Sequence, residues 1–261
     1  MTSSLTDQAP APTQQRVDTI VSAVLAGVRQ ALDANDVTYA EYDAAKQWLI
    51  SVGESGEWPL FLDVFIESTV EQAANRNRVG SKGTILGPFH LTDVAELSTP
   101  AALPMRADEP GERLTFSGTV RSADGATIPG ATVDMWHADS DGLYSGFAEG
   151  VPAGNLRGKV TADGAGSFEV HTVLPAPYEI PKGGPCGALI AAAGWSAFRP
   201  AHLHVIVSAP GHDSLTTQLY FDGGEFLSND IATAVKPELV LTPVAVDGVK
   251  AASYDFVLPT A

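Results

Sequence analysis

Glycine and proline are distributed unevenly along this chain, and that distribution limits the possible folds more than any other feature of the sequence. Residues 1–80 contain 4 glycines and 3 prolines, whereas residues 81–261 contain 21 glycines and 15 prolines. Both residue types favour turns and interrupt regular elements, so the second part must consist of short elements joined by many turns. The sequence therefore predicts a change of architecture near residue 80.

The first part has the apolar periodicity of helices. One stripe repeats every three or four residues and consists of Val17, Ile20, Val21, Val24, Leu25, Val28 and Leu32. Thr38 followed by Glu41 is a capping-box pattern that predicts the start of a second helix. A third helix is predicted from Glu57, with an apolar face made of Phe61, Leu62, Phe65, Ile66 and Val70. Residues 1–12, rich in Pro, Ser and Gln, are predicted to form a flexible tail.

The second part has the pattern of short β-strands separated by turns. Segments rich in alternating or β-branched residues occur at 114–120, 131–138, 166–173, 201–209, 215–221 and 254–258. Several strands at this spacing are typical of a sandwich or barrel. The expected fold is mixed α and β, with a helical domain over residues 13–80 followed by an antiparallel β-sandwich domain over residues 81–261.

The charge and cysteine content exclude several classes of protein. The chain has 15 Lys+Arg against 31 Asp+Glu, a net charge of −16, which argues against partners made of nucleic acid or anionic membrane. The single cysteine, Cys186, excludes an internal disulfide framework and metal sites built from several cysteines. No apolar run reaches the ~18 residues of a membrane-spanning helix. The N-terminus lacks the basic and apolar regions of a secretory signal, so we expect a cytoplasmic protein.

Two histidines in one predicted strand form the first candidate metal site. His202 and His204 are two residues apart, so both imidazoles lie on the same face of the strand. These two residues alone fit either a metal site or a hydrogen-bonded polar face. Tyr144 follows a predicted strand and turn, and Tyr178 lies between prolines, although each tyrosine separately also fits an amphipathic residue at a strand end. Two phenolates with two imidazoles are hard ligands that favour a trivalent ion such as Fe(III) over zinc.

Several segments resemble the intradiol ring-cleavage dioxygenases of the catechol 1,2-dioxygenase type. The resemblance extends from about residue 15 to the C-terminus. Family members place helices before a β-sandwich, as the division near residue 80 also indicates. The matching segments are Gly87-Pro88-Phe89 and residues 130–139, 142–145, 177–181, 199–204 and 208–218.

The resemblance implies an enzyme that uses non-haem Fe(III) and O2 to cleave catechols between the two hydroxylated carbons, giving cis,cis-muconates. By the same resemblance, the ferric ligands are Tyr144, Tyr178, His202 and His204, and Tyr178 also serves as a base for the substrate. Arg199 would stabilise negative charge on the substrate ring, with an ordinary ion pair at the sheet surface as the alternative. Gln218 matches a glutamine near the iron, with a strand residue facing water as the alternative.

The resemblance also implies a substrate cavity with walls from both parts of the chain. For Leu60, Phe89 and Ile231, packing in the core explains an apolar residue almost as well. Asp63 lies on an apolar helical face and therefore needs a partner or a substrate hydroxyl. His90, His171 and His212 have no spacing that indicates ligation. The expected lining consists of Leu60, Asp63, Val64, Ile85, Gly87, Pro88, Phe89, Ile231 and Ala232.

The sequence leaves the exact ring and the assembly open. Residues 177–181 and 235–239 resemble forms that accept chlorocatechols or hydroxyquinol. Residues 86–90 resemble hydroxyquinol forms and residues 58–65 resemble chlorocatechol forms, so these cues conflict. The alternatives are therefore a hydroxyquinol 1,2-dioxygenase giving maleylacetate and, from another class, a non-catalytic β-sandwich that binds an aromatic ligand. The resemblance further implies a homodimer joined through the N-terminal helices, where the stripe from Val17 to Leu32 could face a partner chain, its own domain or the acyl chains of a lipid.

Overall fold

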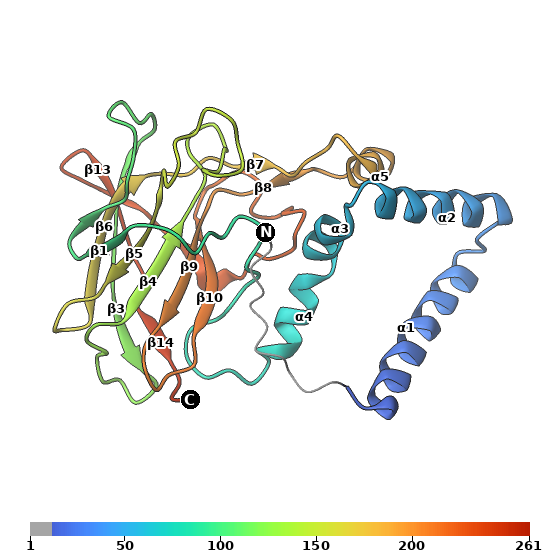
Figure 1. Cartoon of the computed structure of the whole chain (residues 1–261), viewed down its shortest axis with the longest axis horizontal. Helices are drawn as coiled ribbons and strands as arrows, with labels where there is room; N and C mark the ends of the chain where they lie inside the picture. The colour runs from blue at the N-terminus through green and yellow to red at the C-terminus, as the bar shows by residue number, and fades with distance from the viewer. Residues whose placement is uncertain (1–11) are drawn as a thin grey trace. The chain divides into compact units, whose positions relative to one another are not determined.

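The computed structural model describes residues 12–261, in which helices precede two β-sheets (Figure 1). The prediction of a mixed α and β fold with a helical N-terminal region is confirmed. Of the predicted flexible tail, residues 1–11 lie outside the described residues. The chain divides into two compact units, Met1–Ser51 and Val52–Ala261.

The first unit contains α1 (Gln14–Ala34) and most of α2 (Tyr39–Glu54). The predicted capping box is present at the start of α2, where the Thr38 amide donates to Glu41 Oε2 at 2.8 Å and the Glu41 amide donates to Thr38 Oγ1 at 3.3 Å. The apolar stripe of α1 is exposed along its whole length, and α1 contains no buried residue. Within residues 12–261, no helix is both long enough and apolar enough to span a bilayer.

The predicted third helix is two helices, α3 (Trp58–Phe65) and α4 (Glu67–Ala74). The chain leaves helical geometry at Ile66, whose φ of −124° ends α3 and begins α4. The break lets α4 take its own direction, in which Ser68 bonds to Thr233 at 2.9 Å. Apolar spacing alone did not reveal the break, because the apolar residues continue across it.

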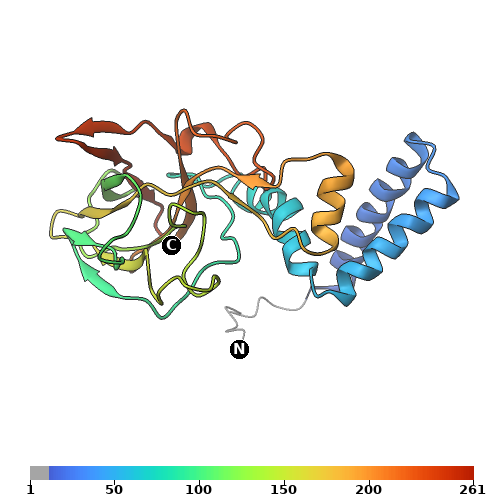
Figure 2. The same cartoon turned by 90° about the horizontal axis from the view of Figure 1, so that it is seen from above.

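Two sheets form the body of the second unit, and Figure 2 shows the β12–β13 hairpin (red) at its edge. The first sheet has the order β1 (Glu96–Ser98), β5 (Arg157–Thr161), β4 (Thr132–Trp136), β9 (His202–Ser208), β10 (Leu215–Phe221) and β11 (Val240–Leu241). The second has the order β12 (Val244–Val246), β13 (Val249–Ser253), β3 (Arg113–Ser122), β6 (Ser167–Val173) and β2 (Ala101–Ala102), with β14 (Phe256–Leu258) also paired to β3. Beside the sheets lie the pair β7 (Tyr178–Glu179) and β8 (Phe198–Arg199), the helix α5 (Pro185–Ala193) and the short 3-10 helix Pro237–Leu239.

The predicted antiparallel pairing is present among the long central strands, and several short strands add parallel pairs. The long central strands pair antiparallel, β4 with β5 and β9, β9 with β10, and β3 with β6. The short strands β1, β2, β11 and β14 each pair parallel with a neighbour, and β13 pairs parallel with β3 but antiparallel with β12. No tight turn connects the two strands of any of these parallel pairs, so nothing forces them to run antiparallel.

Each central strand of the first sheet has one face in the core and one face toward the site. On β9, Leu203, Val205 and Val207 enter the core between the sheets, where side chains of both sheets meet. The intervening residues His202 and His204 lie on the opposite face and are also buried. The two-residue period of a strand therefore separates the apolar core from the polar side chains of the site.

Gly118 on β3 provides a test of this packing. A Cβ at position 118 would lie 1.9 Å from the carbonyl oxygen of Tyr254 and 2.9 Å from Phe168 Cζ. We expect Gly118→Ala to destabilise the fold by about 1–3 kcal/mol, because neither the backbone carbonyl nor the buried ring can move freely. Urea unfolding measures the loss. Gly164→Ala is the control, since no atom lies within 4 Å of its added Cβ, and equal stability of the two variants would contradict the packing described.

Candidate active site

The register of three strands assembles one row of side chains on the outer face of the first sheet. His204 on β9 lies opposite Trp136 on β4 and opposite Gln218 on β10, and His202 lies opposite Tyr220. The Trp136 indole stacks on the His204 ring with centroids 4.7 Å apart and planes 8° apart. Antiparallel pairing thus fixes the position of His204 from both sides and that of His202 from the side of β10.

The two histidines direct nitrogen atoms at each other. His202 Nε2 and His204 Nε2 are 3.0 Å apart. His202 Nδ1 lies 2.7 Å from the carbonyl oxygen of Pro200, which assigns the proton to Nδ1 and leaves the Nε2 lone pair available. Burial, followed by the nearby charge of Arg199, lowers the pKa of His202 to about 3. Burial and then His202 lower the pKa of His204 as well, so both rings are neutral at physiological pH.

Tyr144 and Tyr178 approach the histidines from segments outside the sheet. Tyr144 lies in the loop after β4, and Tyr178 begins β7 as the cross-strand partner of Arg199 on β8. The ring centroids are 5.3 Å apart for the two tyrosines, 5.9 Å for Tyr144 and His204, and 5.7 Å for Tyr178 and His202. Gly142 permits this approach, because its φ is +78° and a Cβ would lie 2.8 Å from Tyr178 Cβ.

The four side chains fit a metal ion that takes nitrogen and oxygen ligands. The Tyr144 hydroxyl is buried and has no hydrogen-bond partner among the described residues. Such an atom is costly unless a ligand satisfies it. Two nitrogens bonded at about 2.1 Å to one ion, at a right angle, are about 3.0 Å apart, which matches the histidine pair. Residues 12–261 contain no cluster of three or more His, Cys, Asp or Glu arranged to hold a metal, so a full ligand set here needs the phenols.

Burial raises the pKa of both phenols in the absence of a metal. For Tyr144 the effect of burial is reinforced by Tyr178, and the pKa lies well above its ordinary value. For Tyr178 burial is opposed by the charge of Arg199. Both hydroxyls are therefore protonated in the metal-free protein, and only a strongly charged ion could displace their protons near neutral pH.

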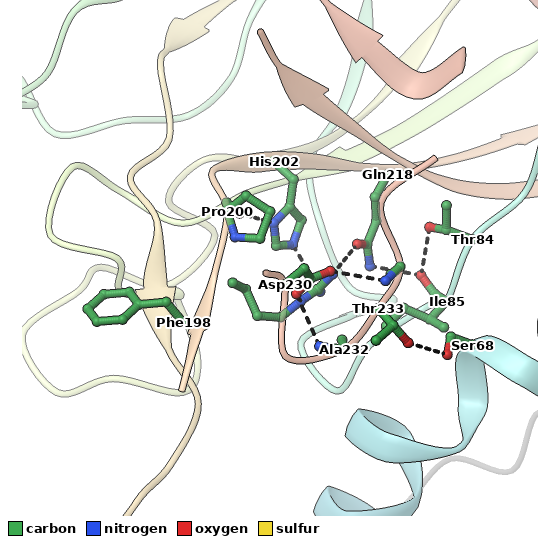
Figure 3. Close-up of polar contacts among 12 residues, drawn as sticks. Ser68, Thr84, Ile85, Phe198, Pro200, His202, Gln218, Asp230, Ala232 and Thr233 are labelled. Atoms are coloured by element: carbon green, nitrogen blue, oxygen red, sulfur yellow. Dashed lines mark hydrogen bonds and ion pairs between the residues drawn. The ribbon is translucent and has the colours of Figure 1, made fainter. Parts of the chain in front are cut away.

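Arg199 is the centre of a buried polar network rather than part of a surface ion pair. Its Nε donates to Asp230 Oδ1 and one terminal nitrogen donates to Asp230 Oδ2, both at 3.0 Å. The same terminal nitrogen donates to Gln218 Oε1 at 2.9 Å. Gln218 is fully buried, so it does not face water, and its amide group donates to the carbonyl oxygen of Ile85 at 2.9 Å. Figure 3 shows His202, Gln218 and Asp230 converging from separate segments.

Asp230 is the residue of this network that the sequence did not reveal. Burial alone would raise the pKa of its carboxyl, but the charge and hydrogen bonds of Arg199 outweigh burial and lower that pKa. Asp230 also accepts hydrogen bonds from the Ala232 and Ala234 amides, both at 3.1 Å. One carboxylate thus orients the guanidinium and shapes the loop that carries Ala232. Its sequence neighbourhood, Asn-Asp-Ile, has the pattern of an ordinary turn, and no local signal distinguishes it.

A narrow cavity lies beside this network, with a free volume of about 30 Å³. Eight of the nine expected lining residues border it, and Ile231 does not. Ile231 instead borders a separate surface groove and packs against the cluster around Val64. Ala232, the next residue in the same loop, borders the cavity. The lining consists of Leu60, Asp63, Val64, Ile85, Gly87, Pro88, Phe89, Tyr178, Ile180, Pro181, Arg199 and Ala232.

Asp63 is the one carboxylate among these lining residues. Burial raises the pKa of its side chain. Its neighbour on α4, Glu67, accepts a hydrogen bond from the Leu86 amide at 3.3 Å, and burial together with the charge of Asp63 raises the pKa of Glu67. The helix pair therefore presents one acidic group to an otherwise apolar wall.

His90 lies beside the site, although its spacing from the other histidines in the sequence did not indicate this. His90 Nε2 is 3.1 Å from Asp134 Oδ2, and its ring contacts Trp136 with centroids 4.7 Å apart. His90 therefore supports the indole that stacks on His204. In contrast, His171 and His212 lie at the surface. His171 hydrogen-bonds to Thr115, and His212 hydrogen-bonds to the carbonyl oxygen of Pro210.

Comparison with known proteins relates the whole described chain to ring-cleaving dioxygenases. Residues 85–260 match a family described as dioxygenase, and residues 14–82 match one described as catechol dioxygenase N terminus. A chlorocatechol 1,2-dioxygenase of Rhodococcus opacus is 45% identical over 224 residues, covering 84% of this chain and 87% of that protein. One of Cupriavidus pinatubonensis is 39% identical, covering 95% and 96%. The crystal structure of the 3-chlorocatechol 1,2-dioxygenase of Rhodococcus opacus matches with a TM-score of 0.89 at 45% identity, covering 95% of this chain and all of that one.

The Arg199–Asp230 pair predicts a large effect of a small substitution. Asp230→Asn keeps the volume of the side chain but leaves the Arg199 charge buried without a counter-charge. We expect a loss of about 3–5 kcal/mol in the free energy of unfolding, measured by urea denaturation. Asp108→Asn, at an exposed position, is the matched control and should change stability by less than about 0.5 kcal/mol. A stable Asp230→Asn protein would show that the ion pair does not hold the site together.

Proposed function

Because the chain belongs to the intradiol catechol 1,2-dioxygenase family, we propose that it uses a non-haem ferric ion and O2 to open catechols between the two hydroxylated carbons, giving cis,cis-muconates. The observation that carries the proposal is the convergence of two neutral imidazoles and two phenols, one with an unsatisfied buried hydroxyl. Chlorinated catechols are among the proposed substrates, since both relatives described above carry that name.

The proposed ligands of the ferric ion are Tyr144, Tyr178, His202 and His204. A ferric ion in this position would bind both oxygens of a catecholate as a Lewis acid and make the ring reactive toward O2. The neutral state of both imidazoles suits this role, because a protonated ring has no lone pair to offer.

Tyr178 and two further side chains, Arg199 and Gln218, have proposed roles in substrate binding. Tyr178 borders the cavity, so its phenolate could accept a proton from a catechol hydroxyl. Arg199 also borders the cavity and carries a fixed positive charge, which would stabilise negative charge on the bound ring. Gln218 holds the Arg199 guanidinium by its carbonyl oxygen and the Ile85 segment by its amide. All three are thus oriented before a substrate arrives.

The cavity favours a ring with apolar substituents. Most of its lining is aliphatic or aromatic, and its free volume is near that of one water molecule, so side chains must move apart to admit a ring. A chlorine or hydrogen on the ring needs no polar partner there. Asp63 is the specific observation that favours the alternative, a hydroxyquinol 1,2-dioxygenase, because its carboxylate could accept a hydrogen bond from a third ring hydroxyl.

The family also supports a proposed assembly. The exposed stripe of α1 is apolar over its length, with Val24 59% exposed. We propose that a second copy of this chain covers the stripe, with lipid acyl chains as the alternative occupant. We also propose that the protein works in the cytoplasm. Light scattering at micromolar concentration tests the dimer: Val24→Glu should give monomers, whereas Gln30→Glu on the opposite face of α1 should not.

Ferric loading tests the iron site and the activity together. Purified protein given ferric iron should turn burgundy through charge transfer from tyrosinate to Fe(III), and it should then consume O2 and catechol in equal amounts. Tyr178→Phe should lower turnover at least about 100-fold, whereas Tyr39→Phe, at an exposed position, should not. A colourless protein with a full complement of iron would contradict the ligand assignment. Catechol binding without O2 uptake would instead support a non-catalytic module.

The ring preference is tested by a substrate panel. Oxygen uptake with catechol, chlorocatechols, methylcatechols and hydroxyquinol should give the highest kcat/KM with the catechols and chlorocatechols. We expect Asp63→Asn to change kcat/KM for catechol little. If hydroxyquinol is the preferred ring and Asp63→Asn lowers its kcat/KM about tenfold, the alternative function replaces the proposed one.

A further inference from the structure

Arg157 is a buried guanidinium beside the proposed ligand Tyr144. It is the first residue of β5, lies opposite Trp136 of β4 and is 1% exposed. Its two terminal nitrogens donate to the carbonyl oxygen of Phe89 at 2.6 Å and to that of Ser145 at 2.8 Å. One side chain thus ties together two segments that are far apart in the sequence.

Both of these bonds fix the surroundings of the Tyr144 ring. Ser145 follows Tyr144 directly, so the bond to its carbonyl holds the backbone that carries the phenol. The Phe89 ring stacks on Tyr144 with centroids 4.2 Å apart and planes 17° apart, and the bond to the Phe89 carbonyl holds that ring in place. The guanidinium carbon of Arg157 itself lies 5.9 Å from the centroid of the Tyr144 ring. This contact lies within the range of a cation–π interaction.

Arg157 forms no ion pair with a carboxylate among the described residues. Burial lowers its pKa, and the charge of Asp134, which pairs with His90, opposes this lowering. Arg199 has Asp230 within 3.0 Å, whereas Arg157 takes part in no ion pair among residues 12–261. Its Nε is buried and also has no hydrogen-bond partner within that range. An uncompensated buried cation is costly. Tyr144 and Asp134 are the two buried groups whose negative charge would act on Arg157, and Tyr144 is the one whose ring the guanidinium contacts.

We propose that Arg157 is a positioning residue for Tyr144 and the positive partner of the Tyr144 phenolate in the iron-loaded protein. This inference rests on the proposed function, because it takes Tyr144 to be a ferric ligand. The fork of two terminal nitrogens holds the ring in place, and the charge lowers the energy of the electrons on the phenolate oxygen. Arg157 does not touch substrate, so its effect passes through the tyrosine.

Two substitutions separate the charge from the hydrogen bonds. Arg157→Gln removes the charge but keeps an amide that can donate to one of the two carbonyls. Arg157→Lys keeps the charge but cannot reproduce the planar fork. Arg121→Gln is the control for removing one arginine charge, since Arg121 lies on β3 in the other sheet and is partly exposed.

The readout is the tyrosinate-to-Fe(III) absorption band together with iron affinity, both measured without substrate. Removing the positive charge raises the phenolate orbital, so Arg157→Gln should shift the band to longer wavelength by on the order of 10–20 nm. It should also weaken iron retention against a chelator about tenfold. Arg157→Lys should keep the band within a few nanometres of the wild type while lowering kcat at little change in KM. Arg121→Gln should match the wild type in all respects.

Three results would overturn the inference. One is a folded Arg157→Gln protein with an unshifted band and unchanged iron retention. Another is an equal shift in Arg157→Lys, which would mean that geometry alone matters. Circular dichroism shows whether Arg157→Gln folds. If it does not fold, the absorption band of Arg157→Lys tests the inference instead, and a large shift of that band to longer wavelength would contradict the role of the Arg157 charge. Failure of the proposed function is distinguishable, because the wild-type protein would then show no tyrosinate band with iron bound.

Discussion

The buried ion pair between Arg199 and Asp230 is the interaction on which the rest of the site depends. Arg199 belongs to β8, so the pair fixes the short strand whose partner Tyr178 borders the cavity. Through Gln218 it reaches the segment of Ile85, and through the backbone amides after Asp230 it reaches Ala232. Two charges nearly excluded from water are stable only when each is fully partnered, and these partners in turn hold Ile85 and Ala232, which line the cavity.

The fold was largely predictable because its signals are local. The two-residue spacing of His202 and His204 placed both imidazoles on one face, and the structure has both on the face opposite Leu203. The capping box at Thr38 marked the start of α2 to within a residue. All six expected strand segments contain strands of the structure. Periodicity and capping depend on neighbours a few residues away, so one sequence suffices to detect them.

The remaining features depend on contacts between distant residues. Asp230 lies 31 residues from Arg199, and the bond of Arg157 to Phe89 spans 68 residues, so neither partner has a local signature. The split of one predicted helix at Ile66 follows from what α4 packs against, not from its own apolar pattern. The parallel strand pairs and the position of Ile231 outside the cavity lining likewise follow from how separate segments meet. The resemblance to a family supplied the cavity residues that spacing alone could not.

The histidines and the cavity walls belong to different structural elements, and this separation affects how the sequence can evolve. His202 and His204 lie on a central strand held on both sides by ladder hydrogen bonds, where a shift by one residue would move both imidazoles into the core. Leu60, Val64 and Ala232 belong instead to a helix and a loop outside either sheet. Substitutions there can reshape the cavity without disturbing the pairing of β9. Selection can therefore change the cavity walls while both imidazoles keep their positions.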